Sequence, residues 1–196
     1  MIEYIAASVL SGAGRLPCPC LDFIMEELRK RKRVHLREYD YATPGGYFVT
    51  ICTRNRRWLF GNAPPPVGRG PCAPPSVAGE IAAEWIGRIS KKFPNWTVEN
   101  WIVMPNHVHL LMQAHSCAAG HAGPALQTVV GWYKTMTTNA CIRAVKSEKM
   151  PPFDGGVWQR SFYDHVIRNE QEYLRVWQYI DDNPANWAED EYYTAL

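Results

Sequence analysis

The sequence predicts an α+β domain in which an antiparallel sheet carries two helices on one face, with a further helix added at the C-terminus. Three observations lead to this prediction. The chain has 196 residues, 46% of them hydrophobic, which suffices for one domain with a buried core. Segments rich in β-branched and aromatic residues alternate with segments whose apolar residues recur at helical spacing. Clusters of Pro and Gly separate these segments and mark the loops.

The first part of the domain is predicted as a strand, a loop and a helix. β-branched and aromatic residues from Tyr47 to Thr53 favour a strand. Pro and Gly are too dense between Gly61 and Gly79 for regular structure, so we expect a surface loop there. Apolar residues at helical spacing from Glu80 to Phe93 then indicate an amphipathic helix.

The same patterns continue to the end of the chain. Strands are expected over 97–104, 107–114 and 157–167, and helices over 125–145 and 169–184. Pro105 and Asn106 form a hairpin turn between the first two of these strands, and Pro124 suits the start of the next helix. Asn169 is a candidate cap of the last helix, which Pro184 ends. The first six elements follow the order β-α-β-β-α-β, which is the ferredoxin-like split arrangement.

Residues 1–35 are expected to form a flexible N-terminal arm, and residues 36–196 a single domain. The arm combines a weakly apolar start, a Pro/Cys kink and five consecutive cations from Arg29 to Arg33. The net charge of +2 gives no sign of a nucleic-acid partner. Two basic runs, 29–33 and 54–57, are either solvated surface or contacts to nucleic acid.

Composition also constrains the compartment. The six cysteines lack the C-x-x-C spacing of zinc or redox sites, so we expect reduced thiols. No apolar run approaches the ~18 residues of a membrane helix. The N-terminus makes a poor signal peptide because it has no basic n-region. We therefore expect a soluble, cytoplasmic protein with no membrane partner.

Two histidines stand out in the apolar segment 107–114. His107 and His109 are two residues apart, so in a strand they share one face with Leu111. Two imidazoles side by side suit a divalent metal. The alternative is a pair of half-buried polar residues with ordinary hydrogen bonds, and the H-x-H spacing alone does not decide between these readings.

The last predicted helix offers groups that could complete such a site. Tyr179 and Asn183 are four residues apart and share a helix face. A tyrosine attacking phosphorus benefits from an adjacent metal, and an amide oxygen suits a hard cation such as magnesium or manganese. The alternatives are structural: Tyr179 could be a core aromatic beyond Val176, and Asn183 could cap the helix.

The segments "VMPNHVHLLM" and "VWQRSFYDHVIRNEQEY…YIDDNP" closely resemble the single-tyrosine HUH transposases, in particular their REP-associated tyrosine transposase branch. HUH denotes His, a hydrophobic residue and His. The segment "REYDYATPGGYFVTICTRNRRWLFG" shares this resemblance, which extends over roughly residues 36 to 187. The Pro/Gly-rich loop is an insertion outside it.

The resemblance implies a ferredoxin-like catalytic domain that nicks and rejoins single-stranded DNA, often at hairpin or repeat ends. His107 and His109 match the metal-binding pair, with magnesium or manganese as the cofactor. Tyr179 matches the nucleophile on the C-terminal helix and would form a covalent 5′-phosphotyrosine. Asn183 matches the polar metal-side residue of that helix, where relatives often carry glutamine.

A single-stranded DNA partner also requires phosphate contacts and stacking surfaces. The basic candidates in family-like segments are Arg54, Arg56, Lys134, Arg160 and Arg168. Trp158 or Phe162 could stack on a base, and His165 could orient the site. The alternatives are surface salt bridges, core aromatics and, for His165, a structural hydrogen bond near Asp164.

Three other functions compete with the transposase that we expect. A domesticated transposase would bind single-stranded nucleic acid without cleaving it, and the set of His107, His109 and Tyr179 argues against that function. A metal-dependent hydrolase that uses water would not need Tyr179. A purely structural domain leaves the histidine pair unexplained. Relatives are monomers or homodimers, and a shared site in a dimer would change which chain supplies Tyr179.

Overall fold

The computed structural model describes residues 40–61, 75–116 and 123–193. The chain divides into two units, Met1–Arg31 and Lys32–Leu196, and all of the described residues belong to the second. The predicted arm, 1–35, and most of the predicted loop, 61–79, lie outside the described residues. These two predictions therefore stay predictions, apart from the end of the loop.

Four antiparallel strands form one sheet. They are β1 (Gly45–Cys52), β2 (Trp96–Met104), β3 (His107–Ala114) and β4 (Tyr163–Ile167), in the spatial order β2-β3-β1-β4. The hairpin strands β2 and β3 lie together, and β1 enters between β3 and β4. This order is that of the split β-α-β arrangement, so the predicted ferredoxin-like fold is confirmed.

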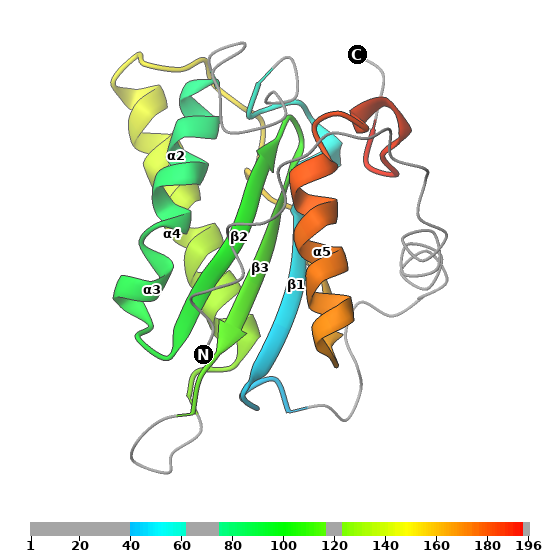
Figure 1. Ribbon diagram of the computed structural model, residues 1–196. Helices are drawn as coiled ribbons and strands as arrows, with labels where there is room; N and C mark the ends of the chain where they lie inside the picture. The colour runs from blue at the N-terminus through cyan, green and yellow to red at the C-terminus, as the bar shows by residue number, and fades with distance from the viewer. Residues whose placement is uncertain (1–39, 62–74, 117–122, 194–196) are drawn as a thin grey trace. The chain divides into compact units, whose positions relative to one another are not determined.

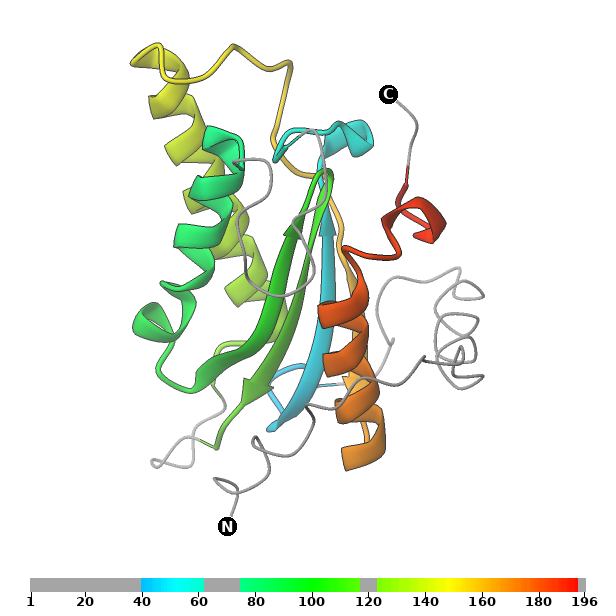
Figure 2. The ribbon, with the colours of Figure 1, turned by 45° about the horizontal axis from the view of Figure 1, so that its top comes forward.

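Helices cover both faces of this sheet (Figures 1 and 2). On one side lie α2 (Val77–Ile86), α3 (Ile89–Lys92) and α4 (Leu126–Lys146). On the opposite side lies α5 (Glu170–Asp182), which contacts β2 and β3. Two short 3-10 turns, η1 (Arg54–Arg56) and η2 (Trp187–Glu189), follow β1 and α5. The helical layer on one face and the added C-terminal helix agree with the prediction, although the first predicted helix is divided into α2 and α3.

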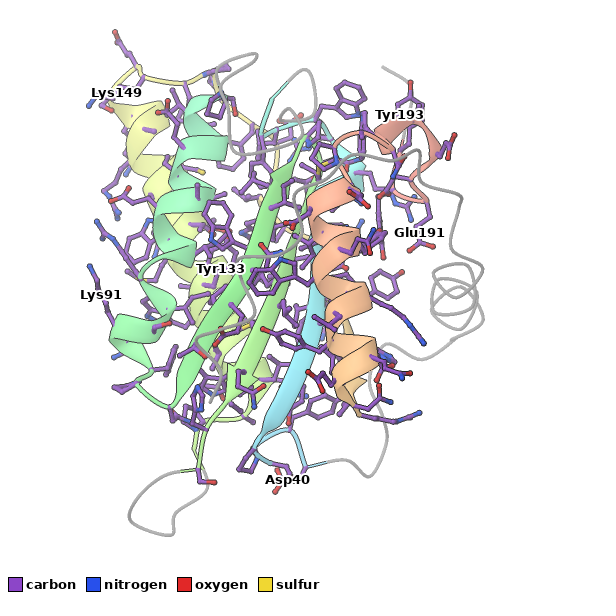
Figure 3. All side chains as sticks on the ribbon, in the orientation of Figure 1. Asp40, Lys91, Tyr133, Lys149, Glu191 and Tyr193 are labelled. Carbon is purple, nitrogen blue, oxygen red and sulfur yellow. The ribbon has the colours of Figure 1, made fainter. Side chains whose placement is uncertain are left out.

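The alternation of side chains along β1 and β3 separates the core from the site. Val49, Val108 and Leu110 are fully buried in the core beneath α2 and α4. In that core Tyr133 of α4, labelled in Figure 3, donates a hydrogen bond to the Ala82 carbonyl of α2. Full burial of an aliphatic side chain such as Val49 or Leu110 contributes about 1.5–3 kcal/mol to the stability of the fold. The residues between them on each strand face α5 instead.

Three element boundaries were predicted wrongly. The helix expected over 80–93 is two helices, because the chain turns at Gly87 and Arg88. The expected loop ends early, because the Ser76 side chain accepts a hydrogen bond from the Gly79 N–H and caps α2 at Val77. The strand expected over 157–167 forms only from Tyr163, and 157–162 is irregular apart from a bridge between Thr53 and Trp158.

The start of α5 was predicted correctly. Asn169 lies just before the helix in an extended conformation, and its side chain accepts a hydrogen bond from the Glu172 N–H. Such a cap satisfies one of the free N–H groups of the first turn. Among the described helices, none is long and apolar enough to cross a membrane.

Candidate active site

The histidine pair, His107 and His109, lies on the face of β3 that α5 covers. Both side chains are fully buried, and their ring centroids are 4.4 Å apart. The two Nε2 atoms are 3.0 Å apart. The prediction that these residues share one face is therefore confirmed, and the pair presents two nitrogen donors to one point.

Neighbouring polar groups orient both rings. The Asn106 amide donates hydrogen bonds to the carbonyls of Tyr192 (2.7 Å) and Arg56 (3.4 Å), so its Oδ1 is the atom that faces His107 Nδ1 at 2.8 Å. An amide oxygen only accepts, so His107 Nδ1 carries the proton and Nε2 presents a lone pair. Thr50 Oγ1 lies 2.9 Å from His109 Nδ1 and, as a hydroxyl, suits either tautomer.

Burial keeps this pair uncharged. Desolvation lowers the pKa of His109 to about 3. Desolvation, then the neighbouring His109 and the Arg56 charge, lower the pKa of His107 well below its usual range. Neutral imidazole is the form that binds metal ions, so both rings are ready to act as ligands at neutral pH.

Helix α5 brings Tyr179 against the histidine pair. Its hydroxyl oxygen lies 3.5 Å from His109 Nε2, and its ring packs edge-on against Phe48 at 5.8 Å between centroids. Phe48 in turn stacks on His109 at 5.2 Å. The sheet and the helix thus place the Tyr179 phenol beside two imidazoles, and the buried Phe48 ring contacts both His109 and Tyr179.

A carboxylate that the sequence analysis missed lies beside the same groups. Asp190 accepts hydrogen bonds from Asn183 Nδ2 (2.8 Å) and Tyr179 Oη (3.4 Å) through Oδ2, and from the Tyr192 N–H (2.6 Å) through Oδ1. One ligand atom each from His107, His109 and Asp190 lies within 4.8 Å of the others. No sequence pattern linked Asp190 to the histidines, because it lies beyond the end of α5 and reaches them only through the fold.

The carboxylate and the phenol influence each other. Burial, followed by the charges of Asp190 and Glu191, raises the pKa of Tyr179 well above its usual value, so the phenol is protonated at neutral pH. Burial also raises the pKa of Asp190, against hydrogen bonds from Tyr192, Asn183 and Tyr179 that lower it.

The donor set fits a divalent cation. Two neutral imidazole nitrogens and a carboxylate are ligands used for first-row divalent metals. The buried Asn183 Oδ1 has no hydrogen-bond partner among the described residues, although the Nδ2 of the same amide contacts Asp190. A buried amide oxygen without a partner is costly, and a cation would satisfy it.

Comparisons with known proteins identify the family. Residues 77–183, more than half of the chain, match the family described as "Transposase IS200 like". The chain belongs to this transposase family. Its general function is therefore DNA transposition.

Individual relatives agree with this assignment. An uncharacterized protein of Haemophilus influenzae is 28% identical over 185 residues, which cover 85% of this chain and 94% of the relative. A second protein of that organism, provisionally named a REP-associated tyrosine transposase, is 28% identical over 86 residues (42% and 46% of the two chains). A solved REP-associated tyrosine transposase bound to a REP hairpin has the same fold, with a TM-score of 0.55, 20% identity, and coverage of 81% and 77%.

Of the basic candidates of this transposase, Arg56 lies at the site. The backbone of η1 is left-handed at Asn55 and Arg56 (φ of 57° and 53°), which is uncommon outside glycine. Arg56 Nη1 donates to the Glu191 carbonyl at 2.9 Å, and its guanidinium lies 5.3 Å from the centre of the Tyr192 ring. The loop therefore holds a cation next to the histidine pair.

The other basic candidates lie elsewhere. Lys134 Nζ donates to the carbonyls of Gln159 and, at 2.9 Å, of Arg160, so this ammonium stabilises the irregular segment 157–162. The side chains of Arg54, Arg160 and Arg168 are exposed. None of these three is brought to the histidine pair by a contact in the described structure. Their DNA contacts stay a prediction.

The two candidate stacking residues lie in the core. Trp158 is 7% exposed, and its Nε1 donates to Thr137 Oγ1 at 2.7 Å. Phe162 is equally buried. Both rings pack within the protein, and stacking of either ring on a base stays a prediction. His165 is also buried, and its Nε2 hydrogen-bonds to Glu172 at 2.5 Å, a contact that ties β4 to α5.

Proposed function

We propose that this protein is a metal-dependent transposase that nicks and rejoins single-stranded DNA through a covalent 5′-phosphotyrosine on Tyr179. The observation that carries the proposal is the 3.5 Å separation between Tyr179 Oη and His109 Nε2 within one chain. Membership of the transposase family supports the same reaction class. A structural tyrosine would not need to lie against two neutral, oriented imidazoles.

The covalent step follows from the phenol's position. Tyr179 Oη attacks a backbone phosphorus and gives up its proton to solvent, while the bond from phosphorus to the 3′ oxygen breaks and that oxygen takes up a proton from solvent. The products are a 5′-phosphotyrosine and a free 3′-hydroxyl. Because the phosphodiester energy stays in the new bond, another 3′-hydroxyl can attack the same phosphorus, release Tyr179 and rejoin the strand.

His107 and His109, with the Asn183 amide beside them, would hold the divalent cation, magnesium or manganese. When bound, this cation offsets the charge that develops on the phosphoryl oxygens. The remaining catalytic work falls to the protein's own groups. Asn106 and Thr50 fix the imidazoles, and Phe48 fixes the angle of the Tyr179 ring. Such positioning favours an in-line attack.

The proposed substrate is single-stranded DNA with a hairpin or repeat structure. This substrate class is supported by the fold shared with a REP-associated tyrosine transposase bound to a REP hairpin and by the similarity to a second protein of that name. Arg56 is the cation best placed to contact a phosphate near Tyr179, because its guanidinium lies beside Tyr192 in the same cluster.

A denaturing gel tests the proposal. The full chain is incubated with manganese and labelled single strands that contain hairpins. We expect a slow-migrating labelled adduct that is lost with Tyr179→Phe and with a chelator. Tyr173→Phe is the matched control, because Tyr173 lies on the same helix and contacts Trp177 rather than the histidine pair.

Other outcomes would change the assignment. Cleavage that persists in Tyr179→Phe without an adduct would contradict the tyrosine mechanism and indicate a metal nuclease that uses water. Hairpin binding without any cleavage would indicate a domesticated binding module.

A further inference from the structure

The turn that follows α5 folds back onto the histidine pair. This C-terminal turn, residues 183–193, contains η2, and Figure 3 shows its labelled residue Glu191 close to the end of α5. The Tyr192 ring lies 4.9 Å from the His107 ring between centroids, and the Asn106 side chain donates to the Tyr192 carbonyl. The turn therefore supplies one wall of the candidate metal site.

We propose that Asp190, from this turn, is the third and only anionic ligand of the metal, completing a site with His107 and His109. This inference rests on the proposed metal-dependent function and extends it to a residue outside the Tyr179 helix. Its first support is geometric. Within the described residues, Asp190 is the carboxylate whose oxygen lies within 4.8 Å of ligand nitrogens from both histidines.

The hydrogen bonds of Asp190 leave room for a metal. A carboxylate offers about four lone-pair sites. Three are used, by the Tyr192 N–H, the Asn183 amide and the Tyr179 hydroxyl. These contacts hold the carboxylate in place and leave one acceptor site. A monodentate ligand with its second oxygen hydrogen-bonded is a common arrangement in metal sites.

Charge balance is the second support. Both histidines are fully buried, and imidazole binds metal as a neutral ligand, so a divalent cation between them would have no compensating charge without an acid. Arg56 adds a further positive charge beside His107 and Asp190. The Asn183 oxygen is neutral and offsets none of this charge. Asp190 supplies the negative charge that makes a cation favourable here.

One consequence sets this site apart from a site built only on β3 and α5. Since Asp190 and the Tyr192 N–H are hydrogen-bonded in the same turn, metal binding should order residues 183–193. A metal held by the histidines and Asn183 alone would have no ligand within residues 184–193, and the hydrogen exchange of those amides should then change less.

The test measures Mn²⁺ binding to the full chain by calorimetry, without DNA. We expect Asp190→Asn to weaken Mn²⁺ binding by ~10-fold or more and His107→Ala to weaken it at least as much. Glu189→Gln, the same charge change one residue away at an exposed position, should bind as the wild type does. Circular dichroism confirms that each variant is folded.

Hydrogen exchange supplies the second readout. Mn²⁺ should protect amides of residues 183–193 in the wild type and in Glu189→Gln, and this protection should be absent in Asp190→Asn. Equal Mn²⁺ affinity for Asp190→Asn and wild type would overturn the assignment of Asp190 while leaving the proposed function intact. Absence of Mn²⁺ binding by the wild type would overturn both. Loss of the DNA adduct in Tyr179→Phe with unchanged Mn²⁺ affinity would separate the nucleophile from the metal site.

Discussion

At the scale of single residues, the site depends on two imidazoles that are buried without charge. His107 and His109 are each oriented by one polar neighbour, Asn106 and Thr50. Burial lowers the pKa of both, because the charged ring would lose its hydration. The arrangement favours metal binding, but protonation of these buried rings lowers the free energy of unfolding.

This coupling predicts a pH-dependent stability. In the unfolded chain both histidines titrate near pH ~6.5, whereas in the folded chain the pKa of His109 is about 3. The unfolded state therefore binds more protons as the pH falls through ~6.5, and the free energy of unfolding should fall on acidification with a slope that approaches about 1.4 kcal/mol per pH unit for each histidine near pH ~5. Denaturant unfolding with a chelator present, between pH 6.5 and 5, measures this slope.

Variants assign the slope to its source. His109→Gln should reduce the slope, while His115→Gln, at an exposed position, should leave it unchanged. Asp190 acts in the opposite direction, since its pKa is raised on folding. A slope that is the same in His109→Gln and wild type would show that the buried histidines are already charged in this range.

At the level of helices and strands, the order of the elements could be predicted from the sequence, because apolar residues recur every second residue in strands and about every 3.6 residues in helices. β3 alternates core residues with the histidine pair, and α5 carries a cap at Asn169. Errors arose where tertiary packing overrides local pattern. The segment 157–162 alternates in a way that resembles a strand, but Trp158 and Phe162 bury their rings in the core instead of extending the ladder.

The candidate site was predictable to the same extent. The two-residue spacing of His107 and His109 predicts that they share a strand face, and the family resemblance links them to Tyr179. The fold brings all three together. Asp190 was not predictable, because it lies beyond α5 and is placed by hydrogen bonds to Asn183 and Tyr192. No regular spacing in the sequence predicts a contact between Asp190 and the histidine pair.

Two glycines in helices test the packing on the core side. In Gly79→Ala the new Cβ would lie 2.4 Å from the Phe60 carbonyl oxygen, so α2 would have to shift, and we expect a loss of about 1–3 kcal/mol. In Gly131→Ala of α4 the Cβ meets nothing within 4 Å, so we expect a gain of up to ~1 kcal/mol from higher helix propensity. Thermal unfolding compares the two. Equal effects would contradict the close approach of α2 to Phe60.

At the scale of the whole molecule, one chain contains every group of the proposed site. The sheet supplies the histidine pair, α5 supplies Tyr179, and the C-terminal turn supplies Asp190, all within the unit that contains the described residues. The sequence alone does not decide whether a dimer shares its sites. Because Tyr179 and His109 lie 3.5 Å apart in a single chain, we propose that the site works in cis.

Mixing inactive variants tests this arrangement. Tyr179→Phe keeps the histidine pair, and His107→Ala keeps the nucleophile. If each site is built from one chain, the mixture should form no more DNA adduct than either variant alone. Recovery of a substantial fraction of wild-type adduct on mixing would show that the tyrosine acts on a partner's histidines.

The covalent bond between Tyr179 and DNA can be located directly. The wild-type chain is allowed to react with a short hairpin-containing single strand and manganese, trapped by denaturation, digested with nuclease and protease, and mapped by mass spectrometry. We expect a nucleotide 5′-phosphate on the peptide that contains Tyr179, and on Tyr179 itself. A nucleotide on any other residue, or cleaved DNA with no modified peptide, would rule out Tyr179 as the nucleophile.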